Sequence, residues 1–188
     1  MTIVTERRTV PGGRRRKPPK SLVSSTLTDD QRRAVHMAAS VLLDYPKAER
    51  RTHFDMIAEA VSGLPTEIAE EFDAFLAAAA AMSQHELEAH FTSIFDQKRK
   101  CCPYLTYYAT GDTRRRGMAL VGFIEAYRAA GWEVEEGELP DYLPMVLEFS
   151  ALSESPIASQ LLASYREGIE VLRTALETAD SPYAHVVS

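Results

Sequence analysis

Apolar residues recur at helical spacing over most of this chain, and convincing runs of alternating apolar and polar residues are missing. From residue 34 onward, apolar side chains repeat every three or four positions, which places them on one face of a helix. Thr28 with Gln31 and Ser83 with Glu86 form Ser/Thr-x-x-Glu/Gln motifs, which are typical of helix N-termini. The pattern predicts an all-α fold, a single-domain helical bundle of roughly seven or eight helices.

The expected helices lie within residues 28–46, 54–62, 65–80, 83–95, 112–131, 143–152 and 157–178. Two stretches between them show no clean periodicity. Residues 96–112 contain basic residues, two cysteines and three tyrosines, and we expect a long loop with a short turn of helix. Residues 132–141 contain five acids and a proline, and we expect a second loop there.

Charge divides the chain into two parts. Residues 1–28 carry seven Lys and Arg against one acid, a net charge of +6, so the rest of the chain carries −12. Residues 1–26 also lack apolar periodicity, which predicts a disordered basic arm. This arm could contact anionic lipid or RNA, but a solvated extension is the favoured interpretation. We expect an all-helical domain over 27–180 and a flexible tail over 181–188.

The composition limits the partners and the compartment. An acidic domain repels phosphate backbones, so we expect no nucleic acid on it, whereas a basic peptide is a suitable partner. The only cysteines, Cys101 and Cys102, are adjacent, which fits a reducing compartment. No apolar run approaches the ~20 residues that span a bilayer, and no secretory signal is evident. The sequence predicts a cytoplasmic protein that reaches a membrane only through a partner.

Catalytic and metal-binding motifs are not found. There is no Gly-rich phosphate loop, no paired-cysteine zinc spacing and no nucleophile motif, so we expect no catalytic residue, metal or cofactor. Cys101 and Cys102 follow three cations that would lower a thiol pKa, which leaves a cytosolic thiol redox sensor as one alternative. Inert thiols are favoured, because adjacent cysteines form a strained ring if they pair.

Aromatic residues cluster in the two loops, where a bundle core does not require them. Tyr104, Tyr107 and Tyr108 lie in the first loop, and Trp132 and Tyr142 lie in or beside the acidic one. Such side chains combine apolar area with a polar handle and serve well as peptide anchors. The clustering favours a groove for a basic, partly apolar peptide. The competing interpretation is that the tyrosines are core residues and that Asp141 caps the helix beginning near Leu143.

Four segments resemble a known family. They are His90-Phe91-Thr92-Ser93-Ile94-Phe95-Asp96, Cys102-Pro103-Tyr104-Leu105-Thr106-Tyr107-Tyr108, Gly111-Asp112-Thr113-Arg114-Arg115-Arg116-Gly117, and the stretch from Glu138 to Phe149 with its Pro-Asp-x-Leu element. Over about residues 28–152 the chain resembles the nitrate reductase assembly chaperones, or delta subunit family, within the redox-enzyme maturation proteins.

The resemblance implies a chaperone and not an enzyme. Such proteins bind the N-terminal peptide of the catalytic (alpha) subunit of nitrate reductase, and they keep it competent for molybdenum cofactor insertion before membrane docking. We also expect a monomer. The residues expected to contact the peptide are Phe91, Phe95, Asp96, Pro103, Tyr104, Tyr107, Tyr108, Glu138, Pro140, Asp141 and Leu143. Further contacts are expected from Arg114, Arg115 and Arg116. The alternative client is a molybdoenzyme of the dimethyl sulfoxide or trimethylamine oxide reductase type.

Overall fold

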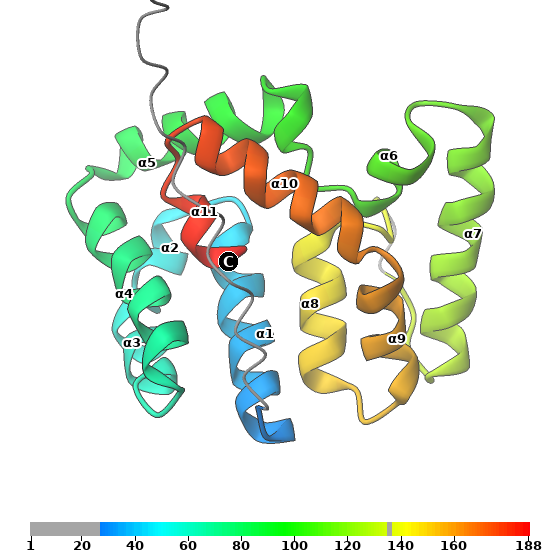
Figure 1. Ribbon diagram of the computed structural model, residues 1–188, viewed down its shortest axis with the longest axis horizontal. Coiled ribbons are helices and arrows are strands. Elements are labelled where there is room, and N and C mark those ends of the chain that lie inside the picture. Colours follow the sequence, from blue (N-terminus) through cyan, green and yellow to red (C-terminus); the bar gives the residue numbers. More distant parts are fainter. Residues whose placement is uncertain (1–26, 135–136) are drawn as a thin grey trace, which may run out of the picture.

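The computed structural model describes residues 27–134 and 137–188, and this part of the chain consists of helices joined by turns and loops (Figure 1). Eight helices have eight or more residues: α1 (Asp29–Leu43), α3 (Phe54–Val61), α4 (Thr66–Ala80), α5 (Gln84–Phe91), α7 (Arg114–Ala129), α8 (Leu143–Leu152), α9 (Pro156–Ser164) and α10 (Arg166–Thr178). Three are shorter: α2 (Ala48–Arg51), α6 (Leu105–Thr110) and α11 (Tyr183–Val186). The described residues form no strand, which confirms the all-α prediction.

Local sequence explains where several helices begin and end. Both predicted capping boxes are present, and at the first of them the Gln31 N–H donates to the Thr28 hydroxyl at 3.2 Å. The Thr28 N–H in turn donates to the Gln31 side-chain oxygen at 3.1 Å. Such caps satisfy backbone donors that a helix leaves open, and each contributes about 1 kcal/mol. At the end of α7, Gly131 has a φ of +81°, a conformation that glycine adopts without strain.

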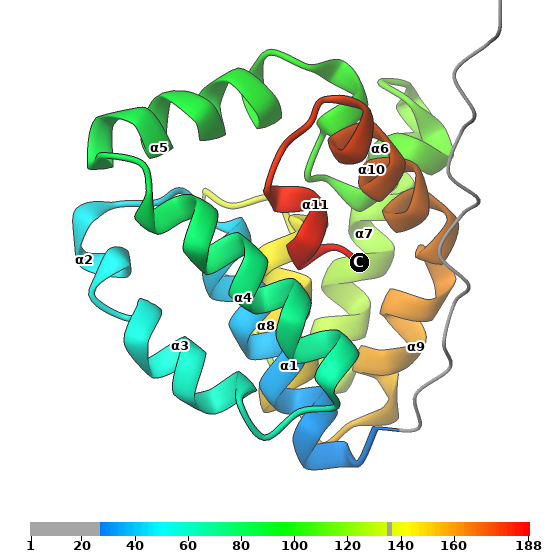
Figure 2. The same cartoon turned by 60° about the vertical axis from the view of Figure 1, so that its left-hand side comes forward.

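Helices α1 and α8 lie side by side at the centre of the fold (Figures 1 and 2). His36 lies 2.9 Å from the Ser150 hydroxyl, and four residues further along α1 the Ser40 hydroxyl donates to the Pro144 carbonyl. These two contacts show that the helices are antiparallel. Burial lowers the pKa of His36 to about 4, with a smaller contribution from Arg32, so this contact uses a neutral imidazole.

The remaining helices surround this pair. Helices α3 and α4 lie on one side of it, and α7 and α9 lie on the other side (Figure 1). Helix α10 runs across one end, close to α6 and to a 3-10 turn at Arg99–Cys101. This turn and α6 account for the short helical structure predicted within residues 96–112. Helix α5 also extends further than its α-helical part, because a π-helical turn continues it over Thr92–Asp96.

The single helix expected over residues 157–178 is wrong. The chain breaks at Tyr165, whose φ of −109° and ψ of 13° separate α9 from α10. No proline or glycine stands at the break. The Tyr165 ring instead packs on Phe123 of α7, with ring centroids 4.9 Å apart. Tertiary packing therefore overrides a continuous helical pattern that the local sequence supports.

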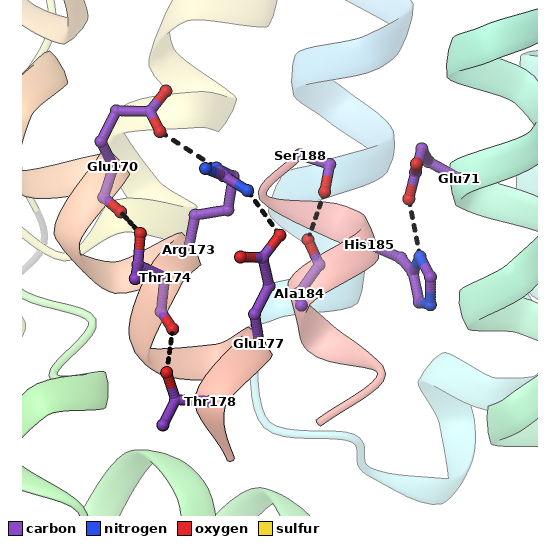
Figure 3. Close-up of polar contacts among 9 residues, drawn as sticks. All are labelled: Glu71, Glu170, Arg173, Thr174, Glu177, Thr178, Ala184, His185 and Ser188. Carbon is purple, nitrogen blue, oxygen red and sulfur yellow. Dashed lines mark hydrogen bonds and ion pairs between the residues drawn. The ribbon is translucent and has the colours of Figure 1, made fainter. Parts of the chain in front are cut away.

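Residues 181–188 do not form the flexible tail that the sequence suggested. Tyr183 has no exposed surface, and its ring contacts Phe75 and Phe95 at centroid distances of 5.0 Å each. Close to it, the imidazole of His185 lies 2.6 Å from a Glu71 carboxylate oxygen, which ties α11 to α4 (Figure 3). Eight residues are too few to display helical periodicity, so this part of the core could not be predicted from the sequence pattern.

Candidate functional site

The two loops that the sequence singled out are joined directly. Tyr104 and Tyr142 form an isolated antiparallel β-bridge through their backbones, and their ring centroids lie 5.4 Å apart. The Leu105 N–H donates to the Asp141 carbonyl at 3.0 Å, and the Leu143 N–H donates to the Pro103 carbonyl at 2.8 Å. These backbone contacts fix the start of α6 against the start of α8. The Pro-Asp-x-Leu element is therefore part of the framework that shapes the surrounding surface.

Asp141 is a buried carboxylate at the centre of this junction. Its Oδ2 accepts hydrogen bonds from the Thr106 N–H at 3.0 Å and from the Thr106 hydroxyl at 2.5 Å. The guanidinium Nη2 of Arg116 lies 4.0 Å from the same oxygen. Asp141 thus caps the first turn of α6, and not α8 as the competing interpretation held. With an exposed fraction of 0%, it offers no surface to a peptide in this structure.

Several other residues expected to contact the peptide are also buried. Phe91 and Phe95 pack against each other with tilted rings whose centroids lie 4.7 Å apart, and both contact Tyr183 in the core. Three more of the expected contact residues are buried as well: Pro103, Pro140 and Leu143. The motifs that these residues belong to therefore mark the packing of the fold and not its outer surface.

The three tyrosines of the first loop are half-buried, and each of them contacts other residues of the fold. The Tyr108 hydroxyl donates to the Cys102 carbonyl at 2.7 Å, and its side chain meets Gly168 of α10 so closely that a Cβ there would lie 3.0 Å from the Tyr108 Cβ and 3.2 Å from the ring. Tyr104 lies beneath the Arg116 guanidinium, 5.6 Å from its ring centroid. Tyr107 packs edge-on against Tyr108. Exposed surface remains at Asp96, Glu138, Arg114 and Arg115.

A hollow of about 500 Å³ lies beside this junction, between α1, α8 and the loop that leads into α8. We call it the acidic hollow. Its lining includes Trp132, Tyr142 and the two methionines Met37 and Met145. Four acids also line it: Asp44, Glu133, Glu138 and Glu148. The lining contains one basic residue, Arg50, whose guanidinium forms an ion pair with Asp44.

The tyrosines of the acidic hollow are neutral. Burial raises the pKa of Tyr142, and the nearby Asp44 carboxylate adds to this effect. The Tyr142 hydroxyl donates to the Asp44 Oδ1 at 3.1 Å. Burial likewise raises the pKa of Tyr127, whose hydroxyl donates to the Pro140 carbonyl. The hollow therefore combines neutral aromatic surface with carboxylates, a combination that suits a cationic, partly apolar ligand.

The sequence found part of this lining and missed the rest. Trp132, Tyr142 and Glu138 belong to the predicted clusters of aromatics and acids. Met37 of α1 and Asp44, the residue that caps the end of α1, come about 100 residues earlier, and no local signal connects them with the acidic loop. Adaptable methionine side chains at the border of an apolar stripe are a weak signal that could have indicated a binding surface.

The prediction that the cations at 98–100 lower the pKa of the cysteine thiols is wrong. Burial raises the pKa of both thiols, and this outweighs the lowering by Lys98 at Cys101 and the lowering by the Tyr104 backbone and Arg116 at Cys102. Both thiols therefore stay protonated, which removes the main support for a redox sensor. Within the described ranges, no cluster of three His, Cys, Asp or Glu side chains could hold a metal ion. No helix in those ranges has the length and hydropathy needed to cross a membrane.

Comparisons with known proteins agree with the fold. A crystal structure from Archaeoglobus fulgidus, described as a redox enzyme maturation protein, superposes with a TM-score of 0.60 at 21% identity. It covers 89% of this chain and 94% of that protein. This likeness shows the shared fold and nothing more.

Sequence comparisons identify the family. The nitrate reductase molybdenum cofactor assembly chaperone NarJ of Bacillus subtilis is 32% identical over 157 residues, 83% of this chain and 85% of that protein. NarJ of Escherichia coli K12 is 30% identical over 77% of this chain and 63% of its own length. Both are named as chaperones and not as enzymes. The nitrate reductase-like protein NarX of Mycobacterium tuberculosis is 35% identical over 82% of this chain, which spans only 23% of NarX. The family model of the nitrate reductase delta subunit matches residues 62–188, and the chain belongs to this family.

Proposed function

We propose that this chain is an assembly chaperone for a respiratory nitrate reductase and binds the N-terminal segment of its apo catalytic (alpha) subunit. In the cytoplasm it holds that subunit competent for molybdenum cofactor insertion, and it delays membrane docking until insertion is complete. The names of the B. subtilis and E. coli relatives support this choice of client over a dimethyl sulfoxide or trimethylamine oxide reductase. The acidic hollow is the observation that supports peptide binding.

The hollow offers two kinds of contact to such a segment. Trp132, Tyr142 and the methionines would accept its apolar side chains, and the carboxylates of Glu133, Glu138 and Glu148 would attract its Arg or Lys. A volume of about 500 Å³ is enough for a few side chains of a peptide and not for a folded domain. Apolar anchors supply most of the affinity at such sites, whereas rim charges orient the ligand and speed its association.

The arginines at the start of α7 provide a second point of contact in this proposal. Arg114 and Arg115 are exposed, so they are available to acidic surface on the client. Arg116 differs from them, because its Nε donates to the Thr106 hydroxyl at 3.3 Å and its guanidinium covers Tyr104. We therefore assign client contact to the first two arginines and a role within the fold to the third.

Reversing two exposed charges of the hollow tests the proposal. The double variant Glu138→Lys/Glu148→Lys is expected to weaken binding of the client's N-terminal peptide by about tenfold at low salt. The loss should shrink at high salt, because exposed charges are screened over about 10 Å at 0.1 M. Fluorescence anisotropy with a labelled peptide measures both effects. A leader peptide from a dimethyl sulfoxide reductase in the same titration tests the choice of client.

The matched control makes the same change in net charge elsewhere on the surface. Glu154 and Glu167 are exposed and do not line the hollow. Glu154→Lys/Glu167→Lys should therefore bind the peptide as the unmodified chain does. Equal weakening in both double variants would show that overall charge, and not this hollow, controls binding.

A further inference from the structure

A second hollow lies along α10, and we call it the basic groove. It has a volume of about 780 Å³ and shares no lining residue with the acidic hollow. One wall is a stripe of α10, and the other is the turn that follows α5. Its lining residues are Lys98, Arg99, Lys100, Cys101, Glu170, Val171, Thr174, Ala175, Thr178 and Ala179.

Helix α10, together with its C-cap Ala179, carries two neighbouring stripes of apolar or small side chains. One contains Gly168, Leu172 and Leu176, which are buried in the core. The other runs from Val171 through 174–175 to 178–179 and lines the groove. This spacing places the second stripe on one face over two helical turns, a length of about 12 Å. Val171 is 52% exposed, so the stripe lies open on the described surface.

The two threonines of this stripe present methyl groups and not free hydroxyls. The Thr174 hydroxyl donates to the Glu170 carbonyl at 2.9 Å, and the Thr178 hydroxyl donates to the Thr174 carbonyl at 2.8 Å (Figure 3). Their hydrogen-bonding capacity as donors is therefore used within α10. With two alanines beside them, the floor of the groove consists of small, mainly apolar side chains, which allows another helix to approach closely.

The residues that line the groove carry a net positive charge. Arg173 pairs with Glu170 at 3.0 Å and with Glu177 at 2.5 Å, so the one acid that lines the groove, Glu170, already has a cationic partner (Figure 3). Lys98, Arg99 and Lys100 are exposed and form no ion pair with a carboxylate of the described chain. Although the sequence after residue 28 carries −12, these three adjacent cations make a local positive patch without an ion-pair partner among the described residues.

From this combination we infer that the basic groove binds an acidic amphipathic helix of a partner protein. The helix places small apolar side chains on the α10 stripe and carboxylates beside Lys98, Arg99 and Lys100. The cations would repel a basic leader peptide, so this surface and the acidic hollow select ligands of opposite charge. A nucleic acid fits less well, because its phosphates would meet an apolar floor and an acidic domain.

A synthetic helix provides the probe. A stapled amphipathic peptide of about 12 residues, with Ala and Leu on one face and Glu along its border, avoids most of the cost of helix formation. A second peptide has Gln in place of each Glu. At low salt, the full chain is expected to bind the Glu peptide about tenfold more tightly than the Gln peptide. Lys98→Glu/Lys100→Glu should abolish this preference in fluorescence anisotropy.

The apolar floor has its own matched control. Val171→Asp is expected to weaken binding of both peptides by about tenfold. Val121 on α7 has the same exposed fraction, 52%, and Val121→Asp should leave both affinities unchanged. Val171→Asp should also bind the client's N-terminal peptide normally, so that failure at this groove is distinguishable from failure at the acidic hollow.

Four results would overturn the inference. Equal affinity for the Glu and Gln peptides would remove the role of the cations, and equal binding by the two valine variants would remove the role of the stripe. Light scattering that shows self-association, lost in Val171→Asp, would assign the groove to a second copy of this chain. Tighter binding of an RNA oligonucleotide than of the Glu peptide would assign the cations to phosphates.

Discussion

Replacing Asp141 by alanine is expected to lower the free energy of unfolding by about 3 kcal/mol, because the change leaves buried polar groups without partners. The Thr106 N–H and hydroxyl would lose their acceptor, and Arg116 would lose a carboxylate 4.0 Å away. In a chain of this length the melting temperature should fall by roughly 6–12 °C. Thermal unfolding followed by circular dichroism measures the loss.

Two controls separate this role from a peptide contact. Asp141→Asn retains an oxygen for Thr106 and should lose less stability than the alanine variant. Glu138→Ala, at an exposed neighbour of the same loop, should leave stability within about 0.5 kcal/mol of the unmodified chain. Because Asp141 is buried, its effect should hardly depend on salt. A strong salt dependence, or a stable Asp141→Ala variant with weak peptide binding, would contradict a capping role.

Tyr183→Ala is expected to cost about 4 kcal/mol, in the range found for buried aromatic side chains. The ring lies in the aromatic core beside Phe75, Phe91 and Phe95, and none of it is exposed. Urea unfolding of the full chain measures the change in stability. A loss below about 1 kcal/mol would show that residues 181–188 are the loose tail that the sequence suggested.

The hydroxyl of Tyr183 supplies the matched control for this variant. It is buried and has no hydrogen-bond partner among the described residues. Tyr183→Phe should therefore be as stable as the unmodified chain or slightly more stable, because it removes an unsatisfied polar group. A large loss in Tyr183→Phe would indicate that the hydroxyl has a partner and that ring packing is not the main contribution.

Local features of the fold could be predicted from the sequence, and long-range features could not. The capping boxes at Thr28 and Ser83 depend on residues three positions apart, so their pattern is visible in a single sequence. The break at Tyr165 depends on Phe123, about 40 residues earlier, and the local pattern favours a continuous helix. Helix propensity is a weak guide wherever tertiary contacts decide the conformation.

The candidate site shows the same division. Clustered aromatics and acids correctly indicated that residues 102–108 and 138–143 lie together. The same clustering cannot distinguish a buried carboxylate from an exposed one, so the sequence predicts peptide contact for both Asp141 and Glu138, although only Glu138 is exposed. The contribution of α1 to the acidic hollow arises from its pairing with α8, which no short-range pattern encodes.

The central claim is that the client's N-terminal segment occupies the acidic hollow, and the fluorescence of Trp132 tests it most directly. Trp132 lines this hollow and is the only tryptophan of the chain, so its emission reports on this location alone. The N-terminal peptide, chosen or altered to lack tryptophan, is titrated into the full chain while its own binding is followed by anisotropy of an attached dye. The account predicts that both signals change together and saturate at the same peptide concentration. Saturable binding in the anisotropy signal with unchanged Trp132 emission would place the peptide elsewhere and contradict the account.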